Sequence, residues 1–392
     1  ENVNPDTHLV LTFSETPVLG DSGMIRVYDA VTDQVVDSLD LSIPSGPTES
    51  RTYGPECDYT KVPYDYTRTV VPTNKDTRPG TPSGTAEPTP PVYQLTIIGG
   101  FTDAFHFYPV IVRDSIATIY LHNNMLEYGH TYYVTIDNGV LNLADGSFQG
   151  VTKEDEWTFT TKSDMPELSD TLIVDATGKG DFNTVQGALD FIPDFNEQQT
   201  VILVNPGDYE ELVYTRNKWN VKIKGAGMAD TKVHYANNEV FNPHPLTVKT
   251  NEWPGTFPSR RAAFMLDNCK DIVIEDMTIA TDLKGQAEGL LINGERIALY
   301  RVHIIGSGDA LQANGTIYME SCELDGGGDT ILGRGSLFAY KSNFRNGGGP
   351  FSWVRNTAGN HGNVFVECTF STEDGKQADY GRTKSNHGSA YP

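Results

Sequence analysis

The sequence predicts an all-β protein in two parts, a β-sandwich followed by a parallel β-helix. Its 392 residues include 38 Gly, 22 Pro and 19 Tyr with only 21% charged residues, which favours a turn-rich β protein over a helical one. Short alternating apolar segments fill the first 162 residues, and a short repeat fills the last third of the chain. At about 150 residues per domain, the length allows two or three domains.

The first part, residues 1–162, contains seven short segments of alternating residues separated by turns, as a β-sandwich requires. They are Leu9–Phe13, Ile25–Tyr28, Tyr93–Ile98, Phe105–Val112, Thr118–Leu121, Tyr132–Ile136 and Trp157–Thr161. Residues 44–91 are rich in Pro, Thr, Ser and Gly and lack an apolar period, so we expect a long irregular insertion. The opening LVLTFSE and the closing YGHTYYVTIDNGVLNLADGSFQG resemble bacterial Ig-like domains.

The polar residues 163–170 form the expected linker, and one helix is expected after it. Asn183–Thr184 provides a cap, apolar residues from Val185 to Ile192 fall on one face, and Pro193 ends the segment. Everything beyond the helix is expected to be β.

The second part carries an internal repeat whose five members align their apolar residues. The members are DIVIEDMTI (271–279), RIALYRVHI (296–304), TIYMESCEL (316–324), SLFAYKSNF (336–344) and NVFVECTF (363–370). Their starts lie 25, 20, 20 and 27 residues apart, too short for each unit to close its own core. This spacing predicts the stacked coils of a parallel β-helix. A propeller is disfavoured, because each of its blades needs about 40 residues.

Two aspartates occupy matching loops of this repeat. Asp309 lies five residues beyond Ile304, Asp329 lies five residues beyond Leu324, and glycines precede each aspartate. Equivalent positions of neighbouring coils stack at about 4.8 Å, so we expect the carboxylates to lie one above the other. Two carboxylates at that distance resist being ionised together, so the pKa of one rises while the pKa of the other stays low. The first carboxyl can then act as an acid and the second as a nucleophile or base. Two alternatives stay open: both residues close glycine turns, or they form a calcium-binding ladder.

Charge and composition exclude several classes of protein. Lys and Arg total 29 against 52 Asp and Glu, a formal net charge of −23 without a basic stripe, so we expect no nucleic-acid partner. No apolar run approaches the roughly 18 residues of a membrane span. Four cysteines match neither a zinc motif nor a CxxC redox site, so free buried thiols are expected, with three pairings left open. The chain opens without Met, so we expect that a leader has been removed and that the protein is secreted, periplasmic or located at the cell surface. We also expect a monomer.

The β-helical part resembles the pectin methylesterases of the right-handed parallel β-helix class. VDATGKGDFNTVQGALDFIP (174–193) resembles their N-terminal signature, and VILVNPGDYEELV, NVKIKGAGMADTKV and AAFMLDNCKDIVIEDMTIAT resemble their next coils. The resemblance covers about residues 171–388, implies a catalytic domain over 171–392 and implies pectin or a related methylated polysaccharide as partner. The family usually continues past the position of Pro392, so a missing C-terminal portion is expected.

The same resemblance implies the catalytic roles. Asp329 in GDTILG matches the nucleophile, Asp309 the acid/base, Gln286 in GQAEGLLI an oxyanion donor, and Arg382 in YGRTK the residue that orients the nucleophile. Carboxylates would supply both nucleophile and acid, so neither cofactor nor metal is expected. Alternatively, Arg382 forms a surface ion pair, and Gln286 is a turn residue or one of a row of stacked amides along the coils.

The sequence departs from the family around these residues. Gly308 stands where the family has a second oxyanion glutamine, and Gln312 is a candidate substitute donor. The aromatic floor for sugar rings is depleted, because Thr330, Gln312 and Lys384 stand where the family has Phe, Tyr and Trp. We expect Trp353 either to stack on a sugar ring or to pack in the core. We expect Arg334 and Arg355 either to contact uronate carboxylates or to be solvated.

Three competing functions are weighed against ester hydrolysis. One is a polygalacturonase-like hydrolase with paired carboxylates and His387, which would release reducing ends. Another is a silent pectin-binding or adhesive protein, which would release nothing. A calcium-dependent lyase is disfavoured, because no coil carries a dense acidic cluster with a basic abstractor.

Overall fold

The computed structural model divides into two compact units. The first comprises Glu1–Glu167 and Thr177–Asn183, and the second, here the β-helical unit, comprises Leu168–Ala176 and Thr184–Pro392. The described residues are 2–47, 70–72, 84–86, 93–99, 105–168, 171–242, 260–354, 361–373, 375–376, 379–381, 384–385 and 388–389. Most of the expected insertion at 44–91 lies outside the described residues.

The first unit is built of small, mainly antiparallel sheets. A five-stranded sheet runs in the order β1 (Asn2–Val3), β14 (Thr158–Thr161), β12 (Thr131–Ile136), β4 (Met24–Asp29) and β5 (Val35–Asp40). A three-stranded sheet has β10 (Val110–Arg113), β11 (Ile116–Ile119) and β2 (Leu9–Thr12). Shorter sheets pair β13 (Leu141–Asn142) with β3 (Val18–Leu19), and join β6 (Val70–Pro72), β7 (Gly84–Ala86), β8 (Leu95–Thr96) and β9 (Phe105–His106).

All seven predicted segments of the first unit contain strands, and the alternation that predicted them buries one face. In β4 the side chains of Ile25 and Val27 are fully buried while their neighbours are partly exposed. The strand β5 was not predicted, because VVDSLD carries two aspartates that interrupt its apolar pattern. The Ig-like assignment of this unit stays a prediction.

The single described helix, α1 (Val185–Phe191), lies where the sequence predicts it. Thr184 is its N-cap, and the Thr184 side chain accepts a hydrogen bond from the Gly187 N–H at 2.9 Å. The chain leaves the helix at Ile192, directly before Pro193. Every residue of the helix is buried, and it packs on β15, β16 and β18.

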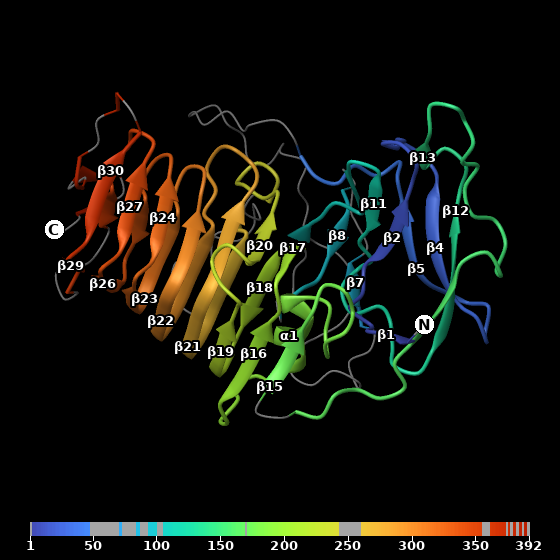
Figure 1. Cartoon of the computed structure of the whole chain (residues 1–392), viewed down its shortest axis with the longest axis horizontal. Coiled ribbons are helices and arrows are strands. Elements are labelled where there is room, and N and C mark those ends of the chain that lie inside the picture. The colour runs from blue at the N-terminus through green and yellow to red at the C-terminus, as the bar shows by residue number, and fades with distance from the viewer. Residues whose placement is uncertain are drawn as a thin grey trace. The chain divides into compact units, whose positions relative to one another are not determined.

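The β-helical unit stacks parallel strands into coils (Figure 1), which confirms the predicted parallel β-helix. The first coils consist of β15 (Thr171–Val174), β16 (Thr200–Val204), β17 (Gly207–Glu210), β18 (Val213–Arg216), β19 (Trp219–Lys224) and β20 (Thr231–Tyr235). The central coils consist of β21 (Phe264–Thr281), β22 (Leu290–Ile305), β23 (Leu311–Glu320), β24 (Glu323–Gly326), β25 (Ile331–Gly333), β26 (Ser336–Tyr340) and β27 (Asn343–Asn346). The last strands are β28 (Ser352–Val354), β29 (Asn363–Val366), β30 (Thr369–Thr372), β31 (Lys384–Ser385) and β32 (Gly388–Ser389).

The five predicted repeats occupy successive coils in register. Ile272 lies opposite Ile297, which lies opposite Ile317, which lies opposite Leu337. The last repeat is offset by one residue from the prediction, because Leu337 rather than Ser336 faces Asn363. The inward apolar residues of these strands form the core of the unit.

At one corner, five successive coils each bend at a residue in the left-handed region. Asp276, Arg301, Ser321, Lys341 and Glu367 have φ between 48° and 59° and follow equivalent strand positions. A single residue in this conformation turns the chain sharply between two strands. The coils therefore bend without glycine at this corner, and the bend leaves the predicted apolar period intact.

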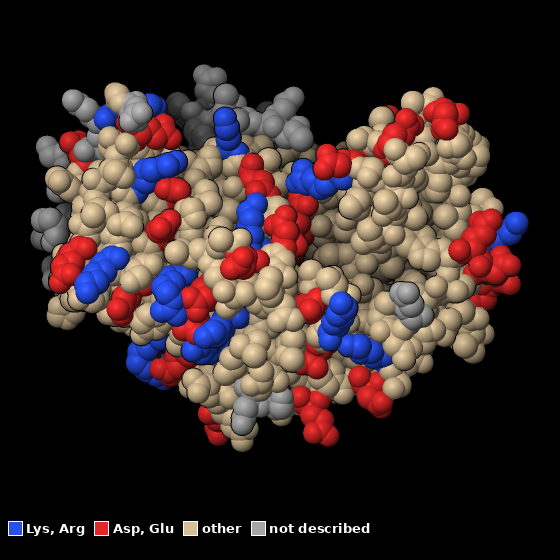
Figure 2. Space-filling view, viewed as in Figure 1, with Lys and Arg blue, Asp and Glu red and all other residues tan. Residues whose placement is uncertain are grey.

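Charged residues over the β-helical unit pair with one another. On the face in Figure 2, Lys and Arg are interspersed with Asp and Glu, and ion pairs such as Lys222–Glu275 and Arg301–Asp276 span neighbouring coils. Cys269 and Cys322 are buried free thiols, as expected, whereas Cys368 is free and only half-buried. Among the described residues, no helix is long and apolar enough to cross a membrane.

Candidate active site

Three acidic residues occupy equivalent positions in three successive coils. Leu290, Leu311 and Ile331 lie opposite one another, and each begins its strand. Glu288, Asp309 and Asp329 stand two residues before those three positions, so they form one column, here called the acidic column. Their exposed fractions are 0%, 4% and 4%. The structure thus stacks the two predicted aspartates and adds a third carboxyl that the sequence analysis missed.

The loops before the column leave no room for a side chain at two of their glycines. A Cβ on Gly308 would lie 2.8 Å from the Gly285 carbonyl oxygen, and one on Gly328 would lie 2.7 Å from the Gly308 carbonyl oxygen. The Gly328 N–H donates to that same Gly308 oxygen. Side chains at these positions would push the coils apart, which explains the glycine-rich loops.

Asp309, the middle carboxyl of the column, has a raised proton affinity. Burial raises the pKa of Asp309 from 3.8 to about 7, and the charges of Glu288 and Asp329 push it in the same direction. The Arg261 guanidinium and the Asp329 N–H, which donates to Asp309, oppose this rise. Burial and the two flanking carboxyl groups therefore favour the protonated form of Asp309 near neutrality.

Arg261 closes the Glu288 end of the column. Its Nε donates to Glu288 Oε1 and Oε2 at 2.8 and 3.0 Å, and its Nη2 lies 2.6 Å from Glu288 Oε1. Nη2 also donates to Asp309 Oδ2 at 3.1 Å. Glu288 and Asp309 raise the pKa of Arg261 above its usual value against the opposing effect of burial, so it stays charged.

Gln286 joins the same cluster from the surface side. Its side chain is exposed, and its Oε1 accepts a hydrogen bond from Arg261 Nη1 at 3.2 Å. The predicted acid, nucleophile and oxyanion donor therefore lie around one guanidinium and one column. In the turns before the two aspartates, the N–H groups of Gly306, Ser307 and Gly328 donate to backbone carbonyls.

Two predicted substrate contacts, Gln312 and Thr330, are buried beside the acidic column, and their roles stay predictions. Gln312 is 2% exposed and Thr330 is fully buried, close to the 4% of Asp309 and of Asp329. Thr330 Oγ1 accepts a hydrogen bond from Asn346 Nδ2 at 2.8 Å, which is an internal contact.

Other predicted residues lie one or two coils beyond the column. Trp353 is half-buried on β28 and faces Leu332 of the neighbouring strand. Arg334 is half-buried just after β25, where its N–H donates to Asn314 Oδ1 at 3.0 Å. Arg382, Arg355 and His387 lie outside the described residues, and for Lys384 only the backbone in β31 is described.

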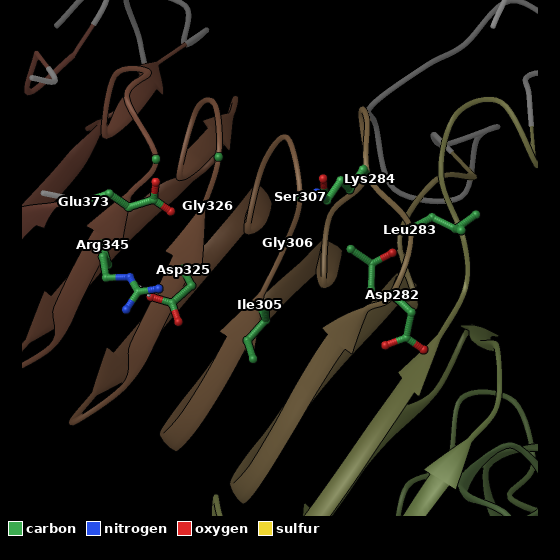
Figure 3. A pocket seen from close by; sticks show the side chains of 13 residues that line it. Asp282, Leu283, Lys284, Ile305, Gly306, Ser307, Asp325, Gly326, Arg345 and Glu373 are labelled. Carbon is green, nitrogen blue, oxygen red and sulfur yellow. Dashed lines mark ion pairs between the residues drawn. The ribbon is translucent and has the colours of Figure 1, made fainter. Parts of the chain in front are cut away.

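A cavity of about 460 Å³ lies beside the glycine turns that precede the two aspartates (Figure 3). Gly306, Ser307 and Gly326 line it, together with the Asp325–Arg345 ion pair, whose Oδ1 and Nε lie 3.3 Å apart. None of the acidic-column residues lines this cavity.

A second, open cavity of about 640 Å³ begins at Gly348 and Gly349, one coil beyond Gly328. Phe351, Phe370 and Tyr380 line it, and Tyr380 is 76% exposed. This aromatic group offers a stacking surface that the sequence analysis did not find, because the three residues are far apart in the chain.

One group of side chains in the described structure could hold a metal ion, and it lies on other coils. Single ligand atoms of Glu210, His234 and Asp282 lie within 4.8 Å of one another. His234 Nδ1 lies 2.5 Å from Asp282 Oδ2, and its Nε2 lies 2.9 Å from Asp208 Oδ1. We assign no metal to it, and the expected absence of a catalytic metal stays a prediction.

Comparison with known proteins supports the resemblance stated from the sequence. Residues 171–347 match the family model described as Pectinesterase, which confirms the family resemblance over that segment. Pectinesterase QRT1 of Arabidopsis thaliana is 31% identical over 170 residues, covering 41% of this chain and 43% of that protein. Pectinesterase 31 of the same plant is 29% identical over 165 residues, covering 41% and 51%. The chain spans about half the length of these curated relatives.

Solved structures of similar proteins were also found. The pectin methylesterase from carrot is 18% identical with a TM-score of 0.44, covering 53% of this chain and 65% of that one. The pectin methylesterase PemA from Erwinia chrysanthemi is 17% identical with a TM-score of 0.45, covering 58% and 75%.

Proposed function

We propose that this chain, whose residues 171–347 match the pectinesterase family, hydrolyses the methyl esters of galacturonate residues in pectin and releases methanol. The observation that carries the proposal is the acidic column, in which a protonated Asp309 lies next to Asp329. Ester hydrolysis by a carboxylate needs a nucleophile, a neighbouring acid and a donor to the oxyanion. The column and Gln286 supply all three.

In the first step, a carboxylate oxygen of Asp329 attacks the ester carbonyl carbon. The carbonyl oxygen becomes an oxyanion, which the Gln286 amide stabilises by donating a hydrogen bond. The tetrahedral intermediate collapses, the bond to the methoxy oxygen breaks, and Asp309 gives its proton to that oxygen. Methanol leaves, and an acyl-enzyme anhydride at Asp329 remains.

In the second step, the now ionised Asp309 takes a proton from water. The hydroxide so formed attacks the acyl carbon and the bond to Asp329 breaks, which frees the Asp329 carboxylate and gives the product carboxylic acid, whose proton passes to the solvent. Asp309 ends protonated, as it began. A pKa near 7 suits both duties, because the group must donate and accept within one cycle.

The polymer is proposed to run past the column toward the cavity of Phe351, Phe370 and Tyr380, where a sugar ring would stack. Arg382 is proposed to orient Asp329, as in the family. Because the proposed substrate is an extracellular polymer, we propose that the protein acts outside the cytoplasm, and that it does so as a monomer. The Ig-like assignment of the first unit fits a secreted protein.

The experiment that tests this function incubates the full chain with highly methylated homogalacturonan and measures methanol and new reducing ends in parallel. Methanol without reducing ends is expected. Reducing ends without methanol would indicate a glycoside hydrolase, and polymer binding with neither product would indicate a binding protein. Either result would overturn the proposal, and fully de-esterified polygalacturonate is the matched substrate control.

A further inference from the structure

Arg261 contacts two of the proposed catalytic groups and none of the family motifs predicted a role for it. We propose that Arg261 is a positioning residue: anchored on Glu288, its guanidinium orients the Gln286 amide and the Asp309 carboxyl for reaction. The inference rests on the proposed ester hydrolysis and adds to it a pair of residues that holds the site in its reactive geometry.

The anchor is a buried, two-point ion pair. Glu288 is fully buried, and Arg261 meets both of its carboxylate oxygens while 19% of the Arg261 side chain remains exposed. A planar guanidinium held by two parallel bonds cannot rotate freely, and lysine cannot reproduce this fork. The remaining N–H groups of Arg261 are therefore fixed in direction.

The first consequence concerns the oxyanion donor. An amide side chain can flip, presenting either its oxygen or its NH₂ group to the substrate. Arg261 Nη1 donates to Gln286 Oε1, and the flipped amide would set N–H groups against N–H groups. The pair therefore keeps the NH₂ group of Gln286 directed away from Arg261 and available to an oxyanion. With glycine at 308, the site depends on this one amide, so its orientation matters more than in a site with two.

The second consequence concerns the acid. The charged groups that surround Asp309 are Arg261, Glu288 and Asp329, and Glu239 lies 3.9 Å from Arg261 Nη1. Arg261 favours the ionised form of Asp309 while Glu288 and Asp329 favour the neutral form. Removing Glu288 alone should therefore lower the pKa of Asp309, and removing Arg261 as well should raise it again.

The variants follow from this logic. Arg261→Met alone leaves Glu288 buried without a partner and risks the fold. The double variant Arg261→Met/Glu288→Gln avoids that charge, and Glu288→Gln is its parent. Arg261→Lys keeps the charge without the fork. Arg296→Met is the matched control, because Arg296 makes a two-point pair with Asp271 on the surface with 56% of its side chain exposed.

Two measurements are made on the full chain: the pKa of Asp309 by carboxyl NMR, and kcat and KM for methanol release across pH. We expect Glu288→Gln to lower the pKa of Asp309 and the double variant to raise it by about one unit or more relative to Glu288→Gln. We expect kcat to fall about 10- to 100-fold in the double variant and in Arg261→Lys, with KM changed little. The Arg296→Met control should alter neither.

The inference is overturned if the double variant keeps kcat within twofold of wild type, or if Arg261→Lys has wild-type kcat. It is also overturned if the Asp309 pKa is the same in Glu288→Gln and the double variant. If wild type releases no methanol, the proposed function fails, and the NMR titration still decides whether Arg261 acts on Asp309.

Discussion

Replacing Asp309 by Asn should change how the stability of the chain depends on pH. In the folded chain burial raises the pKa of Asp309 to about 7, whereas in the unfolded chain the group has an ordinary value near 3.8. Between these values the unfolded state is ionised and the folded state keeps the proton, so stability falls as pH rises. Asn titrates in neither state, so the stability of the variant does not fall with rising pH for this reason.

The raised pKa corresponds to about 4 kcal/mol. Relative to wild type, Asp309→Asn should therefore gain up to about 4 kcal/mol of unfolding free energy between about pH 4 and about pH 8. The amide also loses contacts to Arg261, but that offset does not vary across this range. Urea unfolding curves at one-unit pH intervals measure the difference.

The matched control is Asp325→Asn. The hydrogen bond from His303 lowers the pKa of Asp325, so this group stabilises the fold above its unfolded pKa and the benefit is lost as pH falls. Its variant should gain relative to wild type only below about pH 4. If wild type and Asp309→Asn show parallel profiles from pH 4 to 8, Asp309 titrates normally and cannot serve as the proposed acid.

Three further predictions follow from the same geometry. Gly308→Gln, which would restore the family residue, should destabilise the chain by about 1–3 kcal/mol and lower methanol release, because its Cβ would meet the Gly285 oxygen at 2.8 Å; a gain in turnover would contradict the close packing. Tyr380→Ala should raise KM about 3- to 10-fold with kcat nearly unchanged, while Phe338→Ala, an exposed aromatic outside that cavity, should change neither, and equal effects would argue against stacking at Tyr380. A chelator should leave methanol release intact, since carboxylates supply the nucleophile and acid, and reversible loss on calcium removal would refute this.

The β-helix was predictable because each coil repeats one apolar pattern with similar spacing. Ile272, Ile297 and Ile317 point into the core at the same register, and a repeat of about 20 residues leaves no other way to bury them. Thr184 and Pro193 marked the helix ends for equally local reasons. The stacking of Asp309 and Asp329 followed from loops of equal length.

Arg261 and Glu288 were not predictable in the same way. Glu288 belongs to a loop of a longer coil, so counting from the preceding repeat did not align it with the two aspartates. Its position became clear only from the pairing of Leu290 with Leu311. Arg261 precedes β21 and contacts residues 25 to 48 positions away, and no local pattern signals such a contact. The burial of Gln312 and Thr330 is likewise a property of packed coils.

The most direct test of the account measures methanol release by Asp309→Ala, Asp329→Ala and the double variant, with circular dichroism to show that each is folded. The two carboxyls act as one unit, so each single variant should lose several orders of magnitude in kcat, and the double variant should be scarcely worse than either. Near-wild-type turnover in either folded single variant would contradict the claim that the acidic column performs the chemistry.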